Sequence, residues 1–129
     1  MTDPTNPVSP TGAPALDLGG RRALVTGGAS GIGAAVARAF AAAGAEVTVS
    51  DIDADAAHAL ADGIGGRAWV ADLADTAALE ELELDVDILV NNAGVQRVAP
   101  IHEFDPAAWR LIHRLMVEYA EEIVLGAKL

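Results

Sequence analysis

Three glycines with a fixed spacing follow the first apolar run of the chain. They are Gly27, Gly31 and Gly33 in the octapeptide TGGASGIG at residues 26–33, where a strand must turn and open a helix. Side chains at these positions would block the approach of the backbone to a diphosphate, and a helix N-terminus offers N–H groups and a favourable dipole to an anion. The segment predicts either a diphosphate-binding turn, with backbone contacts from Ser30 and Ile32, or a tight loop that holds no ligand.

An acidic residue follows at the distance that a ribose contact requires. Asp51 comes 18 residues after Gly33 and directly follows the β-branched run EVTVS at residues 46–50. A carboxylate there can accept hydrogen bonds from both hydroxyls of an adenosine ribose, and it would repel a 2′-phosphate. Because no arginine occurs between residues 50 and 55 to offset that repulsion, the sequence favours NAD over NADP. The alternative is that Asp51 only caps the following helix.

Around these positions, segments with the apolar pattern of strands alternate with segments that have the apolar pattern of helices. Short β-branched runs predict strands at residues 23–26, 46–50, 67–71 and 86–91. Alanine-rich windows predict helices at residues 31–43, 53–62 and 75–83, and a fourth helix should extend from Pro106 to Gly126 behind Asp105 as its N-cap. This alternation predicts an α/β fold, the first half of a Rossmann-type doubly wound parallel sheet with strand order 3-2-1-4.

Two of the predicted helices carry apolar residues at helical spacing, so each should pack one face against the sheet. In the first helix the stripe is Ile32, Val36 and Phe40. In the last helix it consists of Trp109, Ile112, Leu115 or Met116, Tyr119 and Ile123.

Composition limits the classes of protein that the chain can represent. Its 129 residues are 52% hydrophobic, which suits one globular domain at residues 19–129, whereas the proline-rich residues 1–18 predict a disordered lead. Eight Lys and Arg against 19 Asp and Glu give a net charge of −11, which argues against nucleic acid and anionic membranes as partners. There is no cysteine and only three histidines, so no metal site is predicted. Without a signal-like or membrane-spanning segment, we expect a cytoplasmic protein.

A second motif, NNAG at residues 91–94, closes the fourth predicted strand. Together with TGGASGIG it resembles the short-chain dehydrogenase/reductase family, over residues 19 to about 117. The resemblance implies an NAD-dependent oxidoreductase in which Asp51, Asp72 and Leu73 contact the adenosine. It further implies that Asn92, Ala93 and Gly94 line the nicotinamide end of the pocket. For Asp72, helix capping or a solvated loop position remains the alternative.

The loop after this motif carries a more specific resemblance. NNAGVQRVAPIHEF at residues 91–104 is similar to the 3-hydroxybutyrate dehydrogenase branch of the family. The resemblance implies a small hydroxy acid or ketone as substrate, with Gln96 helping to hold its carboxylate. The alternative is that Gln96 is an ordinary polar loop residue.

The catalytic groups of the family find no match in this chain. The family uses Tyr-x-x-x-Lys on a helix and a serine on the fifth strand, whereas the single tyrosine here, Tyr119, is followed four residues later by Ile123, and the single lysine is Lys128. Met116 stands where most members carry an asparagine, seven residues after Trp109. From Glu118 onward the sequence no longer resembles the family. Tyr119 is therefore expected to pack in its helix rather than to act as a base.

These departures predict a cofactor-binding half of a dehydrogenase, cut short near its midpoint, that does not turn over alone. One alternative is a noncatalytic dinucleotide-binding or subunit-pairing module that docks on a full-length relative, and another is a nonfunctional fragment. The fourth strand would expose an unpaired edge, which favours association with such a relative or with further copies of the chain.

Overall fold

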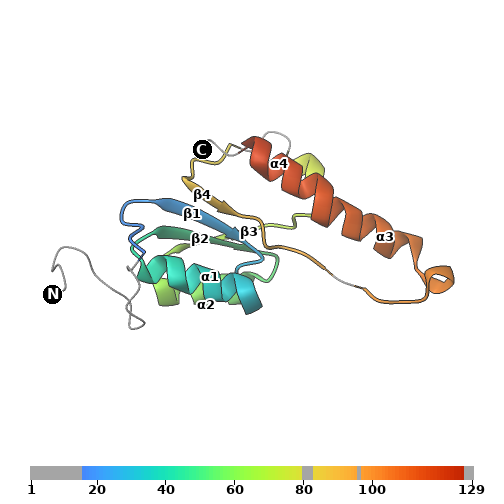
Figure 1. Cartoon of the computed structure of the whole chain (residues 1–129), viewed down its shortest axis with the longest axis horizontal. Helices are drawn as coiled ribbons and strands as arrows, with labels where there is room; N and C mark the ends of the chain where they lie inside the picture. The colour runs from blue at the N-terminus through green and yellow to red at the C-terminus, as the bar shows by residue number, and fades with distance from the viewer. Residues whose placement is uncertain (1–15, 80–82, 96, 127–129) are drawn as a thin grey trace.

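The computed structural model of the chain describes residues 16–79, 83–95 and 97–126. Four parallel strands form one sheet, in the order β3-β2-β1-β4 (Figure 1). Their bounds are β1 (Arg22–Thr26), β2 (Glu46–Asp51), β3 (Arg67–Val70) and β4 (Ile88–Val90). The predicted first half of a Rossmann-type sheet is confirmed, and β1 lies inside it because β2 and β4 pair with its two edges.

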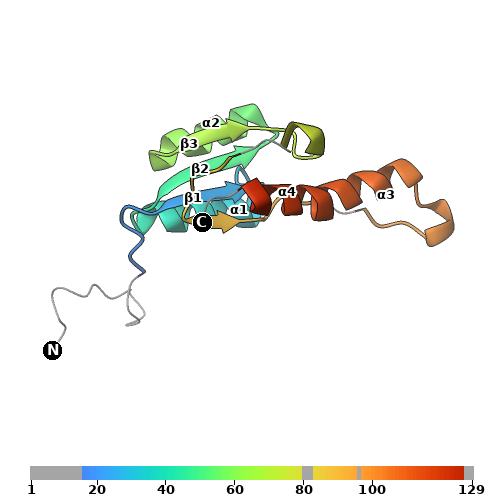
Figure 2. The same ribbon diagram turned by 90° about the horizontal axis from the view of Figure 1, so that it is seen from above.

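Helices cover both faces of this sheet. On one face lie α1 (Gly31–Ala42) and α2 (Ala54–Ile64), and on the other lies α4 (Tyr119–Gly126), as Figures 1 and 2 show. A π-helical segment, η3 (Arg114–Glu118), joins α4 to α3 (Pro106–His113), which extends past the carboxyl ends of the strands. Two 3₁₀ turns complete the elements, η1 (Thr76–Leu79) and η2 (Ile101–Glu103).

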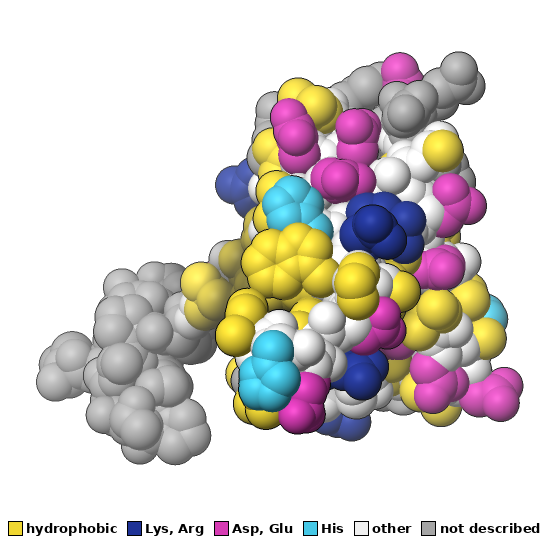
Figure 3. Space-filling view, turned by 90° about the vertical axis from the view of Figure 1, so that its right-hand side faces the viewer, with side chains coloured by type: hydrophobic (Ala, Val, Ile, Leu, Met, Phe, Trp, Pro, Cys, Tyr) yellow, Lys and Arg dark blue, Asp and Glu magenta, His cyan; other side chains and the backbone are white. Residues whose placement is uncertain are grey.

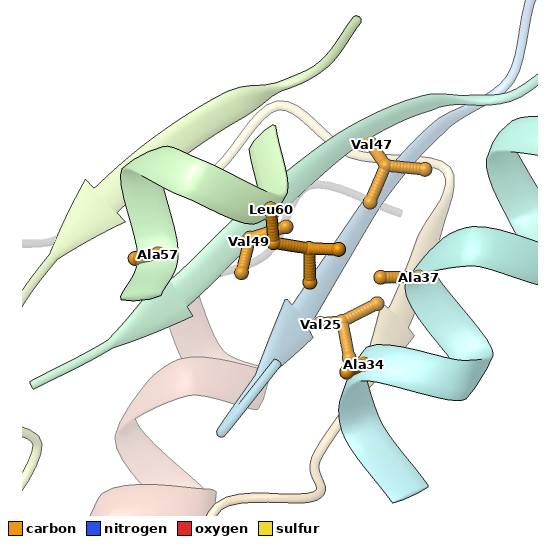
Figure 4. Packing of buried hydrophobic residues seen from close by; sticks show 7 residues of the cluster. All are labelled: Val25, Ala34, Ala37, Val47, Val49, Ala57 and Leu60. Atoms are coloured by element: carbon orange, nitrogen blue, oxygen red, sulfur yellow. The ribbon is translucent and has the colours of Figure 1, made fainter. Parts of the chain in front are cut away.

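Small residues let α1 and α2 approach the sheet closely. Figure 4 shows alanines of both helices facing valines of β1 and β2, and branched valines suit a strand that is covered on both faces. The buried residues of this cluster are Val25, Ala34, Ala37, Val47, Val49, Ala57 and Leu60.

The opposite face has a second core, built around the last helix. Tyr119 and Ile123 of the α4 helix pack against Leu73 and Leu79, and all four are buried. The prediction that Tyr119 packs in the apolar stripe of its helix is confirmed. Among the described residues, no helix has the length and hydrophobicity that a membrane crossing requires.

The predicted stripe on the last helix is wrong at its first residue, Trp109. Trp109 is 60% exposed and stacks edge-to-face on Phe104, with ring centroids 6.2 Å apart. Because α3 extends past the sheet, it has no apolar surface of the sheet to cover, and none of its residues is buried. Hydrophobic side chains gather on the end of the molecule from which α3 projects (Figure 3). The stripe on α1 also begins later than predicted, because Ile32 is 77% exposed whereas Val36 and Phe40 pack against the core.

Several element bounds differ from the predicted ones. The helix predicted at residues 75–83 is a single 3₁₀ turn over 76–79, because burial of Leu79 against α4 needs no more than one turn, and residues 80–82 lie outside the described part. The α2 helix continues through Gly63 and ends at Gly65, whose φ of 67° provides the left-handed C-cap. β4 covers only residues 88–90, because the Asn92 N–H bonds the Thr26 side chain and the Val90 carbonyl instead of a backbone carbonyl of β1.

The lead predicted at residues 1–18 is too long at its C-terminal end. The Leu18 N–H donates to the Ala43 carbonyl at 2.8 Å, so this residue already belongs to the folded part. Residues 1–15 of the predicted lead lie outside the described residues.

Candidate functional site

A cleft of about 540 Å³ opens at the carboxyl ends of the strands. It lies where the strand order reverses between β1 and β4, the switch point at which doubly wound sheets bind ligands. Its lining comes from the glycine-rich turn, the ends of β2, β3 and β4, and the last helical region. The residues are Gly27, Ser30, Asp51, Ile52, Ala71, Asp72, Leu73, Ala74, Asn92, Ala93, Gly94, Val95, Leu111 and Leu115.

The three glycines of the turn are required for three different reasons. Gly27 has a φ of 60°, and a Cβ there would lie 2.8 Å from the Cα of Ala93. Gly33 has no room either, because its Cβ would lie 2.5 Å from Nδ2 of Asn92 and overlap the carbonyl of Gly27. Gly31 has open space around it but a φ of 55°, which side chains disfavour. The turn can thus bring its backbone close to both the sheet and a ligand.

The N-terminus of α1 lies beside this cleft, which its N-cap residue Ser30 lines. The first helical bond runs from the Ala34 N–H to the Ser30 carbonyl, so the N–H groups of residues 31–33 have no acceptor within the helix. Ser30 occupies the N-cap position with extended backbone, but its side chain makes no capping bond. These N–H groups therefore remain able to bind an anion, and the exposed Ile32 can contribute its backbone.

Asp51 lies half-buried at the end of β2, beside the turn. Its Oδ2 accepts from the Ala29 N–H and its Oδ1 from the Asp53 N–H, both at 3.1 Å. The N-cap of α2 is Asp53, whose Oδ1 accepts from the Ala56 N–H. The capping role offered as an alternative for Asp51 thus belongs to Asp53, and the Asp51 carboxylate faces the cleft.

Two neighbours on the next loop line the same side of the cleft as Asp51. Asp72 is exposed and its Oδ1 accepts from the Ala74 N–H at 3.0 Å, whereas Leu73 is buried in the second core. Both line the cleft, together with Asp51, and no lysine or arginine does so among the described residues. This side of the cleft is therefore negatively charged. No group of three or more metal-ligating side chains occurs in the described part of the chain.

A buried threonine joins the glycine-rich turn to the NNAG motif. Oγ1 of Thr26 accepts from the N–H groups of Asn92 and Ala93, at 3.1 and 3.2 Å, and donates to the Val90 carbonyl at 3.3 Å. Nδ2 of Asn92 in turn donates to the Gly27 carbonyl at 3.1 Å. From the sequence, Thr26 was expected only as the first residue of the turn motif, with no role for its side chain. Its fully buried hydroxyl fixes the ends of β1 and β4 relative to each other.

The far end of the cleft lies against the last helical region. A Cβ on Gly94 would lie 2.8 Å from Sδ of Met116, so glycine lets this loop pack closely there. Nearby, the buried Tyr119 hydroxyl donates to Oδ1 of Asn91 at 3.4 Å. Burial raises the pKa of Tyr119 to about 12, which keeps the phenol neutral at physiological pH. Gln96, the predicted substrate contact, lies outside the described residues.

The sheet order and the glycine-rich turn at its switch point place the chain in the class of Rossmann-type α/β proteins. Within that class it belongs to the short-chain dehydrogenase family, because the family model for short chain dehydrogenase matches residues 21–118. The predicted family membership is confirmed.

Individual relatives agree with this assignment. The chain is 44% identical over 104 residues to D-threitol dehydrogenase of Mycolicibacterium smegmatis, covering 71% of this chain and 40% of the relative. It is also 44% identical over 107 residues to D-beta-hydroxybutyrate dehydrogenase of Cupriavidus necator, covering 74% and 42%. A gluconate 5-dehydrogenase from Burkholderia cenocepacia, solved with NADP and tartrate, matches with a TM-score of 0.73 at 36% identity, covering 87% and 49%. The chain thus spans about 40% of the length of these curated relatives.

Proposed function

We propose that residues 19–129 form the NAD-binding part of an oxidoreductase that acts on the CH–OH group of a small hydroxy acid. The observation that carries the proposal is the pairing of two features across one cleft. Free N–H groups at the start of α1 can hold a diphosphate, and the Asp51 carboxylate can accept hydrogen bonds from a ribose. The site fits a dinucleotide because Gly27 and Gly33 let the glycine-rich turn pack directly against the NNAG motif, which leaves the backbone of the turn at the edge of the cleft.

The charge of the cleft supports NAD rather than NADP. A 2′-phosphate would lie beside Asp51, with Asp72 also on this side and no cationic residue among the described lining to compensate. Two like unit charges about 4 Å apart near a protein surface repel by about 4 kcal/mol before salt screening. The gluconate 5-dehydrogenase from Burkholderia cenocepacia was solved with NADP, so family membership alone does not favour NAD and the preference requires a direct measurement.

In this proposal, NAD supplies the hydride acceptor and the chain supplies its placement. Asn92, Ala93 and Gly94 would line the nicotinamide end, and the Thr26 hydroxyl holds the first two of them in place. Gln96 would bind the carboxylate of a substrate such as 3-hydroxybutyrate, which the likeness to D-beta-hydroxybutyrate dehydrogenase supports. Oxidation of an alcohol also needs a base, and Tyr119 is unsuited because its phenol is buried with a pKa raised to about 12. The chain alone is therefore expected to bind NAD without turning over.

Calorimetric titration of the 129-residue chain tests the proposal directly. We expect NAD⁺ to bind at least about tenfold more tightly than NADP⁺, and the variant Asp51→Ser to narrow that ratio. Asp55→Ser is the matched control, because Asp55 lies in the first turn of α2 and does not line the cleft. A folded sample that binds neither nucleotide would contradict the proposal, and steady NADH formation from 3-hydroxybutyrate would contradict the expected lack of turnover.

A second candidate function is pairing with a full-length relative. It is favoured by β4, whose three residues are only half-buried and whose one sheet partner among the described residues is β1. An apolar strand with a free edge is a template for a further strand. Co-purification at fixed stoichiometry with a full-length short-chain dehydrogenase would support this candidate, and a monomer at high concentration beside such a relative would contradict it. Self-association and a cytoplasmic location remain further proposals.

A further inference from the structure

We infer that Asp51 is also a positioning residue, whose carboxylate holds the glycine-rich turn in its ligand-binding shape. The inference rests on the proposed function, because it concerns the same diphosphate site. Its basis is the hydrogen bond from the Ala29 N–H to Oδ2 of Asp51, which connects two segments 22 residues apart. Ala29 lies in the middle of the turn, between the left-handed Gly27 and Gly31.

The turn needs such support because its own backbone favours no single shape. Glycines reach positive φ at little cost, but they also leave the free chain with many alternative conformations. Two other tethers hold the start of the turn: the Gly28 N–H donates to the Ser50 carbonyl at 3.0 Å, and Nδ2 of Asn92 donates to the Gly27 carbonyl. The bond to Asp51 holds the next residue along, directly before the N-cap of α1.

A carboxylate can perform both tasks at once. Its two oxygens offer about four acceptor positions, and the bonds from Ala29 and Asp53 occupy one on each oxygen. Because Asp51 lines the cleft, the remaining positions would be available to ribose hydroxyls. Because the acceptor is charged, its bond to the turn is stronger than a bond to a neutral group. One side chain would thus both recognise the sugar and shape the neighbouring phosphate site.

Amide hydrogen exchange in the ligand-free chain tests this role without any nucleotide. In Asp51→Ala we expect the Ala29 amide to exchange about tenfold faster than in the wild type. Asp51→Asn keeps an oxygen acceptor and should restore most of the protection. Asp72→Ala is the matched control, because it removes an equal charge from the same cleft while its carboxylate bonds only the nearby Ala74 N–H. It should leave the exchange of Ala29 unchanged.

The core amide of Val49 in β2 serves as the reference for global opening. An unchanged exchange rate of the Ala29 amide in Asp51→Ala would overturn the inference. So would an equal increase of the Ala29 exchange rate in Asp72→Ala, or an equal increase of the Val49 exchange rate in Asp51→Ala.

Inorganic pyrophosphate provides a second test, because it contains no ribose. Loss of negative charge alone should help both alanine variants to bind it, so weaker binding by Asp51→Ala than by Asp72→Ala supports the role in shaping the turn. Equal binding by the two variants counts against it. If the wild type binds neither NAD nor pyrophosphate, the proposed function fails, while the exchange of Ala29 still decides whether Asp51 holds the turn.

Discussion

Gly33→Ala is the change that most directly tests how the cleft is built. Gly33 lies buried in the first turn of α1, where a methyl group would overlap the Gly27 carbonyl and lie 2.5 Å from Nδ2 of Asn92. Those two groups are hydrogen-bonded to each other. The methyl group must therefore push the glycine-rich turn away from the NNAG motif and lengthen or break that bond.

The expected loss of stability follows from three contributions. Overpacking costs about 1–3 kcal/mol, and the Asn92–Gly27 bond contributes about 0.5–1.5 kcal/mol. Alanine in place of glycine in a helix returns about 0.5–1 kcal/mol. We expect Gly33→Ala to lower the free energy of unfolding by roughly 2 kcal/mol, with a fall in Tm on the order of 8 °C, and to abolish measurable NAD binding.

Denaturant unfolding and calorimetric titration measure both effects. Gly63→Ala is the matched control, because Gly63 lies in α2, where an added Cβ would meet nothing within 4 Å and the backbone φ is not strained. It should gain about 0.5–1 kcal/mol of stability and bind NAD as the wild type does. If Gly33→Ala proves as stable as the wild type and binds NAD equally well, the steric account of the turn is refuted.

Three further changes test other parts of the site. Gly31→Ala has room for its methyl group but a φ of 55°, so denaturant unfolding should show a loss of about 1 kcal/mol. Thr26→Val leaves the Ala93 N–H without its acceptor and the Asn92 N–H with only the Val90 carbonyl, and it should cost about 1–3 kcal/mol, whereas Thr26→Ser should cost less. Because burial raises the pKa of Tyr119 to about 12, the unfolded state loses its phenolic proton first, and stability should fall between pH 10 and pH 12 by at most about 1.4 kcal/mol per pH unit. Tyr119→Phe should remove that fall.

Local patterns were sufficient to predict the first half of the fold. The strand predicted at residues 46–50 is β2, and the helix predicted at 31–43 is α1, because β-branched runs and a glycine-rich turn act over a few residues. The position of Asp51 at the end of a predicted parallel strand was enough to place it at the cleft, since the carboxyl ends of parallel strands share one edge of the sheet.

Features that depend on distant pairing could not be predicted in this way. Thr26 acquires its role only when β4 lies beside β1, which brings the N–H groups of Asn92 and Ala93, 66 and 67 residues later, onto its hydroxyl. Trp109 has the spacing of a packing residue, yet its helix extends past the sheet, so no core lies beneath it. Sequence periodicity shows which side of a helix is apolar but not whether anything covers that side.

The projection of α3 leaves one end of the molecule with much less buried surface than the sheet. This helix buries none of its residues and is continued by the π-helical segment η3, so its backbone bonds depend mainly on the helix itself. Only its junction with η3 connects it to the buried residues of α4, so its far end should fray first. Heating should therefore melt α3 at a lower temperature than the sheet, in a gradual loss of helical signal that precedes the cooperative transition. The side of the cleft that Leu111 lines would therefore lose its ordered structure first, while the side formed by β1 and β2 stays folded.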